Sequence, residues 1–62
     1  MLKKIREKRG LSQSQLSELS GVSLRMIQGY EQGEKNINKA SGIILYNLSR
    51  ALGCRMEDLI EK

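Results

Sequence analysis

The sequence predicts an all-α fold, a compact bundle of five short helices in which the second and third form a helix-turn-helix. Three observations lead to this class. Serines able to cap a helix stand directly before three segments that carry apolar residues at helical spacing. Glycines stand directly after three such segments, where helices commonly end. Proline is absent, and no run of small polar residues marks a linker.

The first predicted helix begins at the N-terminus and ends near Gly10, because glycine suits the residue just past a helix end. Leu2, Ile5 and the aliphatic stem of Arg6 recur at helical spacing. They form the apolar face of this helix.

The second predicted helix spans about Gln13 to Ser20. Ser12 precedes it as a cap, and Gln15 stands three residues later, where its side chain can return the hydrogen bond to the Ser12 backbone. Leu11 and Leu16 flank this capping box at the spacing of a hydrophobic staple. Both signals indicate that the helix begins directly after Ser12.

A sharp turn separates this helix from the third, which is predicted from about Leu24 to Gln32. Gly21 takes a left-handed conformation readily, and Ser23 can cap the following helix. Ser17, one turn before the glycine, is small enough to let two helices cross closely. Gly33 marks the end of the third helix. Together these features predict the helix-turn-helix.

The segment from Glu34 to Ala40 is polar and predicts a loop with one tight helical turn. Ser41 can cap a fourth helix that continues to about Leu52. Three leucines at helical spacing form its buried face: Leu45, Leu48 and Leu52.

A short fifth helix is predicted over about Met56 to Glu61. Arg55 occupies its cap position, so the start depends on Glu57 and Asp58, whose charges complement the helix dipole. We therefore expect this helix to fray more than the others.

Length and composition restrict the class of protein. The 62 residues suffice for one domain, residues 1–62, with a small core. A single cysteine, Cys54, and the absence of histidine argue against a disulfide scaffold, a metal site or a cofactor. No nucleophile, base and orienting group occur together, so no enzyme is expected. The longest apolar run is too short to cross a membrane and no signal peptide is visible, so a cytoplasmic protein is expected.

The net charge of +4 is unevenly distributed along the chain. Basic residues dominate the first segment, whereas Glu57, Asp58 and Glu61 gather near the C-terminus. A basic surplus is typical of a module that binds phosphate groups. Taken alone, however, the charge favours a merely solvated basic helix. Only together with the helix-turn-helix motif does the charge favour nucleic-acid binding.

These residues together resemble the phage repressor and Cro family of helix-turn-helix regulators, also called the xenobiotic-response-element type. The resemblance covers nearly the whole chain. It lies in Leu2, Ile5, Arg6, Leu11, Ser12, Gln13, Leu16, Gly21, Val22, Ser23, Ile27, Tyr30, Glu31, Gly33, Ala51, Leu52, Gly53, Asp58 and Leu59. It implies a lambda-repressor-like fold and binding to double-stranded DNA.

Within this motif, the third helix is the candidate recognition helix, and Val22, Ile27 and Tyr30 mark its buried side. The candidate base-contacting residues lie on or near its exposed side: Ser23, Leu24, Arg25, Gln28 and Gly29. In the major groove, arginine can pair with guanine, glutamine with adenine, and leucine can contact a thymine methyl group. The alternative is that these side chains are only solvated, with Leu24 partly packed. Relatives commonly carry a long polar side chain where Gly29 stands, so this glycine either loses a base contact or permits close backbone approach.

The resemblance also implies phosphate contacts and one structural ion pair. Gln13 matches a family position that holds the DNA backbone, assisted by the free amides of a helix N-terminus. Further phosphate candidates lie at and after the end of the third helix: Gln32, Lys35, Asn36 and Lys39. Ordinary loop polarity is the alternative. Arg6 and Glu31 match positions that pair and lock the recognition helix to the scaffold, against the alternative of an exposed arginine without a fixed partner.

The function expected from the sequence is that of a small transcriptional regulator, a repressor that reads double-stranded DNA with its third helix. Family members generally bind pseudo-palindromic operators as two-fold dimers, so a homodimer is expected. Its interface lies either at Gly53–Met56 or on the face that carries Ile43 and Tyr46. The alternative function is a protein-interaction module of the same fold, either an adaptor or an antitoxin that masks a toxin. Salt-sensitive binding to duplex DNA would favour the regulator.

Overall fold

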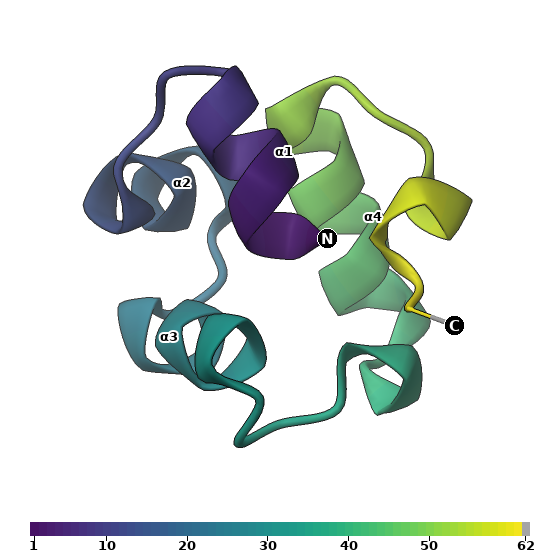
Figure 1. Ribbon diagram of the computed structural model, residues 1–62. Helices are drawn as coiled ribbons and strands as arrows, with labels where there is room; N and C mark the ends of the chain where they lie inside the picture. Colours follow the sequence, from purple (N-terminus) through teal and green to yellow (C-terminus); the bar gives the residue numbers. More distant parts are fainter. Residues whose placement is uncertain (62) are drawn as a thin grey trace.

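The computed structural model describes residues 1–61 and contains four α-helices (Figure 1). They are α1 (Leu2–Lys8), α2 (Gln13–Ser20), α3 (Leu24–Gln32) and α4 (Gly42–Leu52). Two 3-10 turns complete the chain: η1 (Ile37–Lys39) precedes α4, and η2 (Met56–Leu59) follows it. The described residues contain no strand, and the predicted all-α class is confirmed. Within these residues, no helix is long and apolar enough to cross a membrane.

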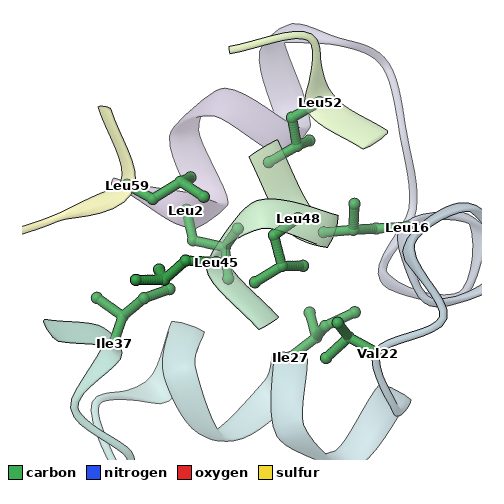
Figure 2. Close-up of a cluster of buried hydrophobic side chains, with 9 residues drawn as sticks. All are labelled: Leu2, Leu16, Val22, Ile27, Ile37, Leu45, Leu48, Leu52 and Leu59. Atoms are coloured by element: carbon green, nitrogen blue, oxygen red, sulfur yellow. The ribbon is translucent and has the colours of Figure 1, made fainter. Parts of the chain in front are cut away.

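Side chains from every element meet in one apolar core (Figure 2). α2 packs against both α3 and α4, α1 packs against α3, and η2 packs against α4. The core consists of Leu2, Leu16, Val22, Ile27, Ile37, Leu45, Leu48, Leu52 and Leu59. It includes all three leucines predicted on the buried face of the fourth helix. Because isolated helices this short are marginal in water, this burial is what holds them in place.

Local hydrogen bonds confirm the predicted starts of α2, α3 and α4. The Ser12 hydroxyl accepts from the Gln15 backbone at 3.0 Å, and the Gln15 side chain accepts from the Ser12 backbone at 2.8 Å. The capping box is therefore present in both directions. Ser23 and Ser41 each accept a hydrogen bond from the backbone N–H three residues later.

The C-terminal segment differs from the prediction of a fifth α-helix. Instead of a helix that continues to Glu61, the chain forms the single turn η2, and the backbone is extended at Ile60. Arg55 offers no side-chain acceptor, although Asp58 accepts from the Arg55 N–H at 3.0 Å. A segment this short forms too few α-helical hydrogen bonds to offset the cost of nucleation. The turn is sufficient to bury Leu59, so the bundle has four α-helices instead of five.

The turn between α2 and α3 is held on both sides by hydrogen bonds. Gly21 ends α2 in the left-handed conformation, with φ 75° and ψ 5°. Ser17 Oγ then donates to the Val22 carbonyl at 2.7 Å, and Ser20 Oγ accepts from the Val22 N–H at 3.1 Å. Ser17 thus contributes a hydrogen bond as well as its small size. Since Val22 is itself buried, the start of α3 has a defined position relative to α2.

Candidate nucleic-acid interface

The start of α3 exposes three of the predicted base-contacting residues. Ser23, Leu24 and Arg25 are exposed, whereas Ile27, which lies on nearly the opposite side of the helix from Arg25, is fully buried. Leu24 is 37% exposed, so part of this side chain is covered by the protein. The Ser23 hydroxyl caps α3 by accepting from the Met26 nitrogen at 3.2 Å. An exposed guanidinium and a leucine are therefore adjacent at the start of this helix.

The other two predicted base-contacting residues lie differently. Gln28 is half-buried. Gly29 lies on the side of the helix that carries the exposed Arg25, as expected, but it is itself buried, which corrects the expectation that it is open to a partner there. The physical reason is the side chain of Lys35, which lies across it: a Cβ placed on Gly29 would be only 3.0 Å from Lys35 Cδ. At this position, the side chain next to solvent is that of Lys35.

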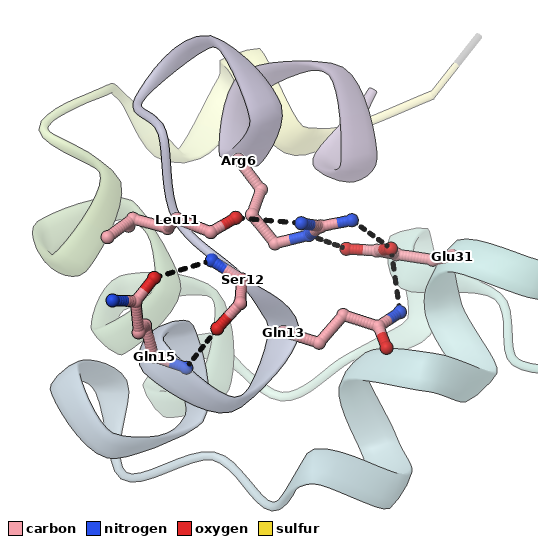
Figure 3. A network of polar contacts seen from close by, with 6 residues as sticks. All are labelled: Arg6, Leu11, Ser12, Gln13, Gln15 and Glu31. Carbon is pink, nitrogen blue, oxygen red and sulfur yellow. Dashed lines mark hydrogen bonds and ion pairs between the residues drawn. The ribbon is translucent and has the colours of Figure 1, made fainter.

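A buried polar cluster joins α1, α2 and α3 (Figure 3). Arg6 Nε donates to Glu31 Oε2 at 2.6 Å, and Arg6 Nη2 donates to Glu31 Oε1 at 3.0 Å. Arg6 Nη1 donates to the Leu11 carbonyl at 2.8 Å. The two charged side chains are only 10% and 3% exposed. A bidentate pair enclosed in this way restricts how α3 can turn relative to α1.

Burial and hydrogen bonding act in opposite directions on the Glu31 carboxyl. Burial raises its pKa, but hydrogen bonds from Arg6 and Gln13 and the positive charges of Arg6 and Lys3 outweigh this effect, and the pKa lies below its ordinary value. The pKa of Arg6 is raised, chiefly by its hydrogen bond to Glu31. Both groups are therefore charged at neutral pH, as a bidentate pair requires.

Gln13 is part of this cluster. It is the first residue of α2, where backbone N–H groups have no helical partner. Its side-chain Nε2 donates to Glu31 Oε1 at 2.9 Å. The amide that the family resemblance assigns to the DNA backbone is thus oriented by the ion pair. No local pattern in the sequence signals this link.

The remaining predicted phosphate contacts are all exposed and lie from the last residue of α3 to the last residue of η1. They are Gln32, Lys35, Asn36 and Lys39. Asn36 Oδ1 accepts from the Asn38 N–H at 3.0 Å and caps η1. Ile37 anchors the segment in the core, since only 2% of it is exposed. This anchor keeps the polar residues close to the end of α3.

One further contact that sequence reasoning misses secures the scaffold behind this face. Arg9 Nε donates to the Leu52 carbonyl at 2.7 Å, and Arg9 Nη2 donates to the Gly53 carbonyl at 3.3 Å. A cation near the end of a helix is favourable because the last carbonyl groups are otherwise unpaired. The contact joins the end of α1 to the end of α4, and the two segments are too far apart in the sequence for any local pattern to reveal it.

A comparison with protein-family models adds to this geometry. A family model described as helix-turn-helix matches residues 2–59, nearly the whole chain. Searches of curated proteins and of solved structures found no significant match.

Proposed function

This chain belongs to the helix-turn-helix family of the phage repressor and Cro type, and on this premise we propose that it is a sequence-specific repressor of transcription. At the family level it is a DNA-binding transcription regulator. Its third helix, α3, enters the major groove of an operator, and the bound protein occludes a promoter.

The observation that carries this proposal is the arrangement of α3. One side of the helix is locked to the scaffold by the buried pair of Arg6 and Glu31, while Arg25 on another side is exposed. The major groove admits an α-helix, and base edges there differ for every base pair. Arg25 suits guanine, Gln28 suits adenine, and Leu24, with Ser23 beside it, suits a thymine methyl group.

Phosphate contacts supply the remaining affinity in this proposal. They position a protein on the duplex without reading its sequence. Gln13 at the start of α2 holds one backbone segment. A second segment is held from the end of α3 onward by Gln32, Lys35, Asn36 and Lys39.

We also propose that the protein binds a pseudo-palindromic operator as a homodimer. A groove of about 580 Å³ lies between α1 and η2, next to the Gly53–Met56 turn. Its apolar lining includes Ile5 and Ile60. Its charged lining includes Lys8 from α1 and Glu57 from η2. In a two-fold interface the same surface of both subunits is in contact, so Lys8 of each subunit can pair with Glu57 of the other, and the ion pair forms twice. Ile43 and Tyr46 are also exposed, and the charged side chain that contacts this face is Arg50, whose Nη1 donates to the Tyr46 hydroxyl at 3.0 Å.

Sedimentation tests this dimer. Reversal of one charge, Glu57→Lys, should weaken the dimer, and Lys8→Glu in the same chain should restore it. An unchanged association in the single variant would exclude this groove and favour the Ile43 and Tyr46 face.

Fluorescence anisotropy tests the DNA contacts, with a duplex selected from a random pool and a scrambled duplex at several salt concentrations. Arg25→Ala and Gln28→Ala should each cost roughly 1–3 kcal/mol on the selected duplex, because a base contact is lost. Gln28→Ala should leave binding to the scrambled duplex almost unchanged. Lys39→Ala should weaken binding to both duplexes alike and lower the slope of log affinity against log salt concentration by about 0.9. Lys4→Ala removes the same charge from an exposed position on α1 and is the matched control.

One result would contradict the proposed function. If Arg25→Ala, Gln28→Ala and Lys39→Ala all bind both duplexes as the parent does, with the helix content intact, α3 is not a recognition helix. The alternative function, a protein-interaction module, would then be favoured over that of a repressor. Its signature is salt-insensitive binding to a protein partner such as a toxin.

A further inference from the structure

Gly29 is buried on a side of α3 where its neighbours are exposed. Arg25 lies one turn before it and Gln32 lies almost one turn after it, and both are exposed. This side of the helix therefore does not face the core. Another part of the chain must cover the glycine.

Lys35 is the residue that covers it. Gly33 ends α3 in the left-handed conformation, with φ 82°. The Lys35 N–H donates to the Gly29 carbonyl at 3.0 Å. A Cβ placed on Gly29 would lie 3.0 Å from Lys35 Cδ, 3.1 Å from Cγ and 3.4 Å from Cε. A methyl group at position 29 would thus force the Lys35 methylene groups to move by a few tenths of an ångström.

The covered methylene chain brings a positive charge to the exposed side of α3. Lysine commonly lays its methylene groups on the protein surface while its ammonium stays in water. The ammonium of Lys35 is one bond beyond Cε, on the side of the helix that also carries Arg25. A compact ammonium binds phosphate oxygens as a point charge. Glycine inside a helix lowers the stability of the helix. At position 29 the absence of a side chain leaves space for the methylene groups of Lys35.

We propose that Gly29 positions Lys35, and that Lys35 contacts a DNA phosphate at the edge of the groove that α3 occupies. This inference rests on the proposed function, in which α3 enters the major groove. Gly29 is a positioning residue, because its whole effect on DNA is exerted through Lys35.

A thermodynamic cycle tests the coupling between the two residues. It compares the parent with Gly29→Ala, Lys35→Met and the double variant, by anisotropy on the selected and scrambled duplexes. Lys35→Met keeps an unbranched side chain and removes the charge. Lys4→Met removes the same charge from α1 as the matched control, and far-UV circular dichroism verifies that every variant is folded.

The expected results follow from one lost phosphate contact. The ratio of the parent's DNA affinity to that of Lys35→Met should fall roughly 3.5-fold between about 50 and 200 mM salt, on both duplexes. Gly29→Ala should weaken binding and lower the salt slope while Lys35 is present. It should have no further effect once Lys35 is replaced. Lys4→Met should keep the slope of the parent.

Three results would overturn the inference. An equal effect of Gly29→Ala with and without Lys35 would show that the glycine acts on DNA directly. An unchanged salt slope in Lys35→Met would exclude the phosphate contact, and a loss confined to the selected duplex would assign Lys35 to a base instead. In all three cases the parent still binds DNA selectively. Absence of that binding in the parent would instead contradict the proposed function.

Discussion

Removal of the Arg6 guanidinium should destabilise the protein strongly. Arg6→Ala leaves the Glu31 carboxylate, which is 3% exposed, with Gln13 as its remaining side-chain donor. It also removes the donor to the Leu11 carbonyl. Loss of one partner from a buried ion pair costs about 3–5 kcal/mol, because the other charge stays buried without compensation. A chain of 62 residues has a total free energy of unfolding of roughly 3–9 kcal/mol, so the substitution should remove at least about a third of it.

Urea denaturation followed by far-UV circular dichroism measures this effect. Arg6→Lys should retain only part of the stability, because an ammonium cannot form the bidentate contact with the carboxylate. Arg6→Met combined with Glu31→Met removes both charges at once. This double variant should be more stable than the sum of the two single effects predicts, with a coupling of about 0.5–3 kcal/mol.

Two outcomes would refute the reasoning. A denaturation midpoint of Arg6→Ala equal to that of the parent would show that the pair is screened by solvent. Strictly additive effects of Arg6→Met and Glu31→Met would show that the two side chains do not interact energetically. Either result would remove the argument that this pair fixes α3 to the scaffold.

Three further predictions concern pH, backbone conformation and thiol chemistry. The pKa of Glu31 is lowered on folding. The ionised carboxylate therefore stabilises the protein fully above its ordinary pKa near 4.5, and this stabilisation is lost as pH falls through the pKa of the folded state. Urea midpoints measured at several pH values should show this loss in the parent and less of it in Glu31→Gln. Gly21→Ala should lower the free energy of unfolding by about 1–2 kcal/mol, since φ is 75° there, whereas Gly42→Ala, at an open position of α4, should raise it by about 0.5 kcal/mol. Burial and the charge of Asp58 raise the pKa of Cys54, so iodoacetamide should modify it more slowly at neutral pH than it modifies a small free thiol, and an equal rate would contradict this.

Much of the fold was predictable because the signals that set helix ends are local. The capping box of Ser12 and Gln15 spans three residues, and the left-handed Gly21 and Gly33 end helices without help from distant groups. Helical periodicity likewise predicts the leucines of α4 that enter the core. These interactions form between residues less than two turns apart, so the sequence alone determined the bounds of α2, α3 and α4.

Only the tertiary structure decided what surrounds each side chain of α3. Periodicity places Gly29 beside the exposed Arg25, but it contains no information on the chain beyond the end of the helix. The left-handed turn at Gly33 brings Lys35 back over the glycine and buries it. In the same way, Gln13 meets Glu31 only because α2 and α3 pack together. Contacts between separate elements depend on the angles at which those elements pack, and no local pattern encodes these angles.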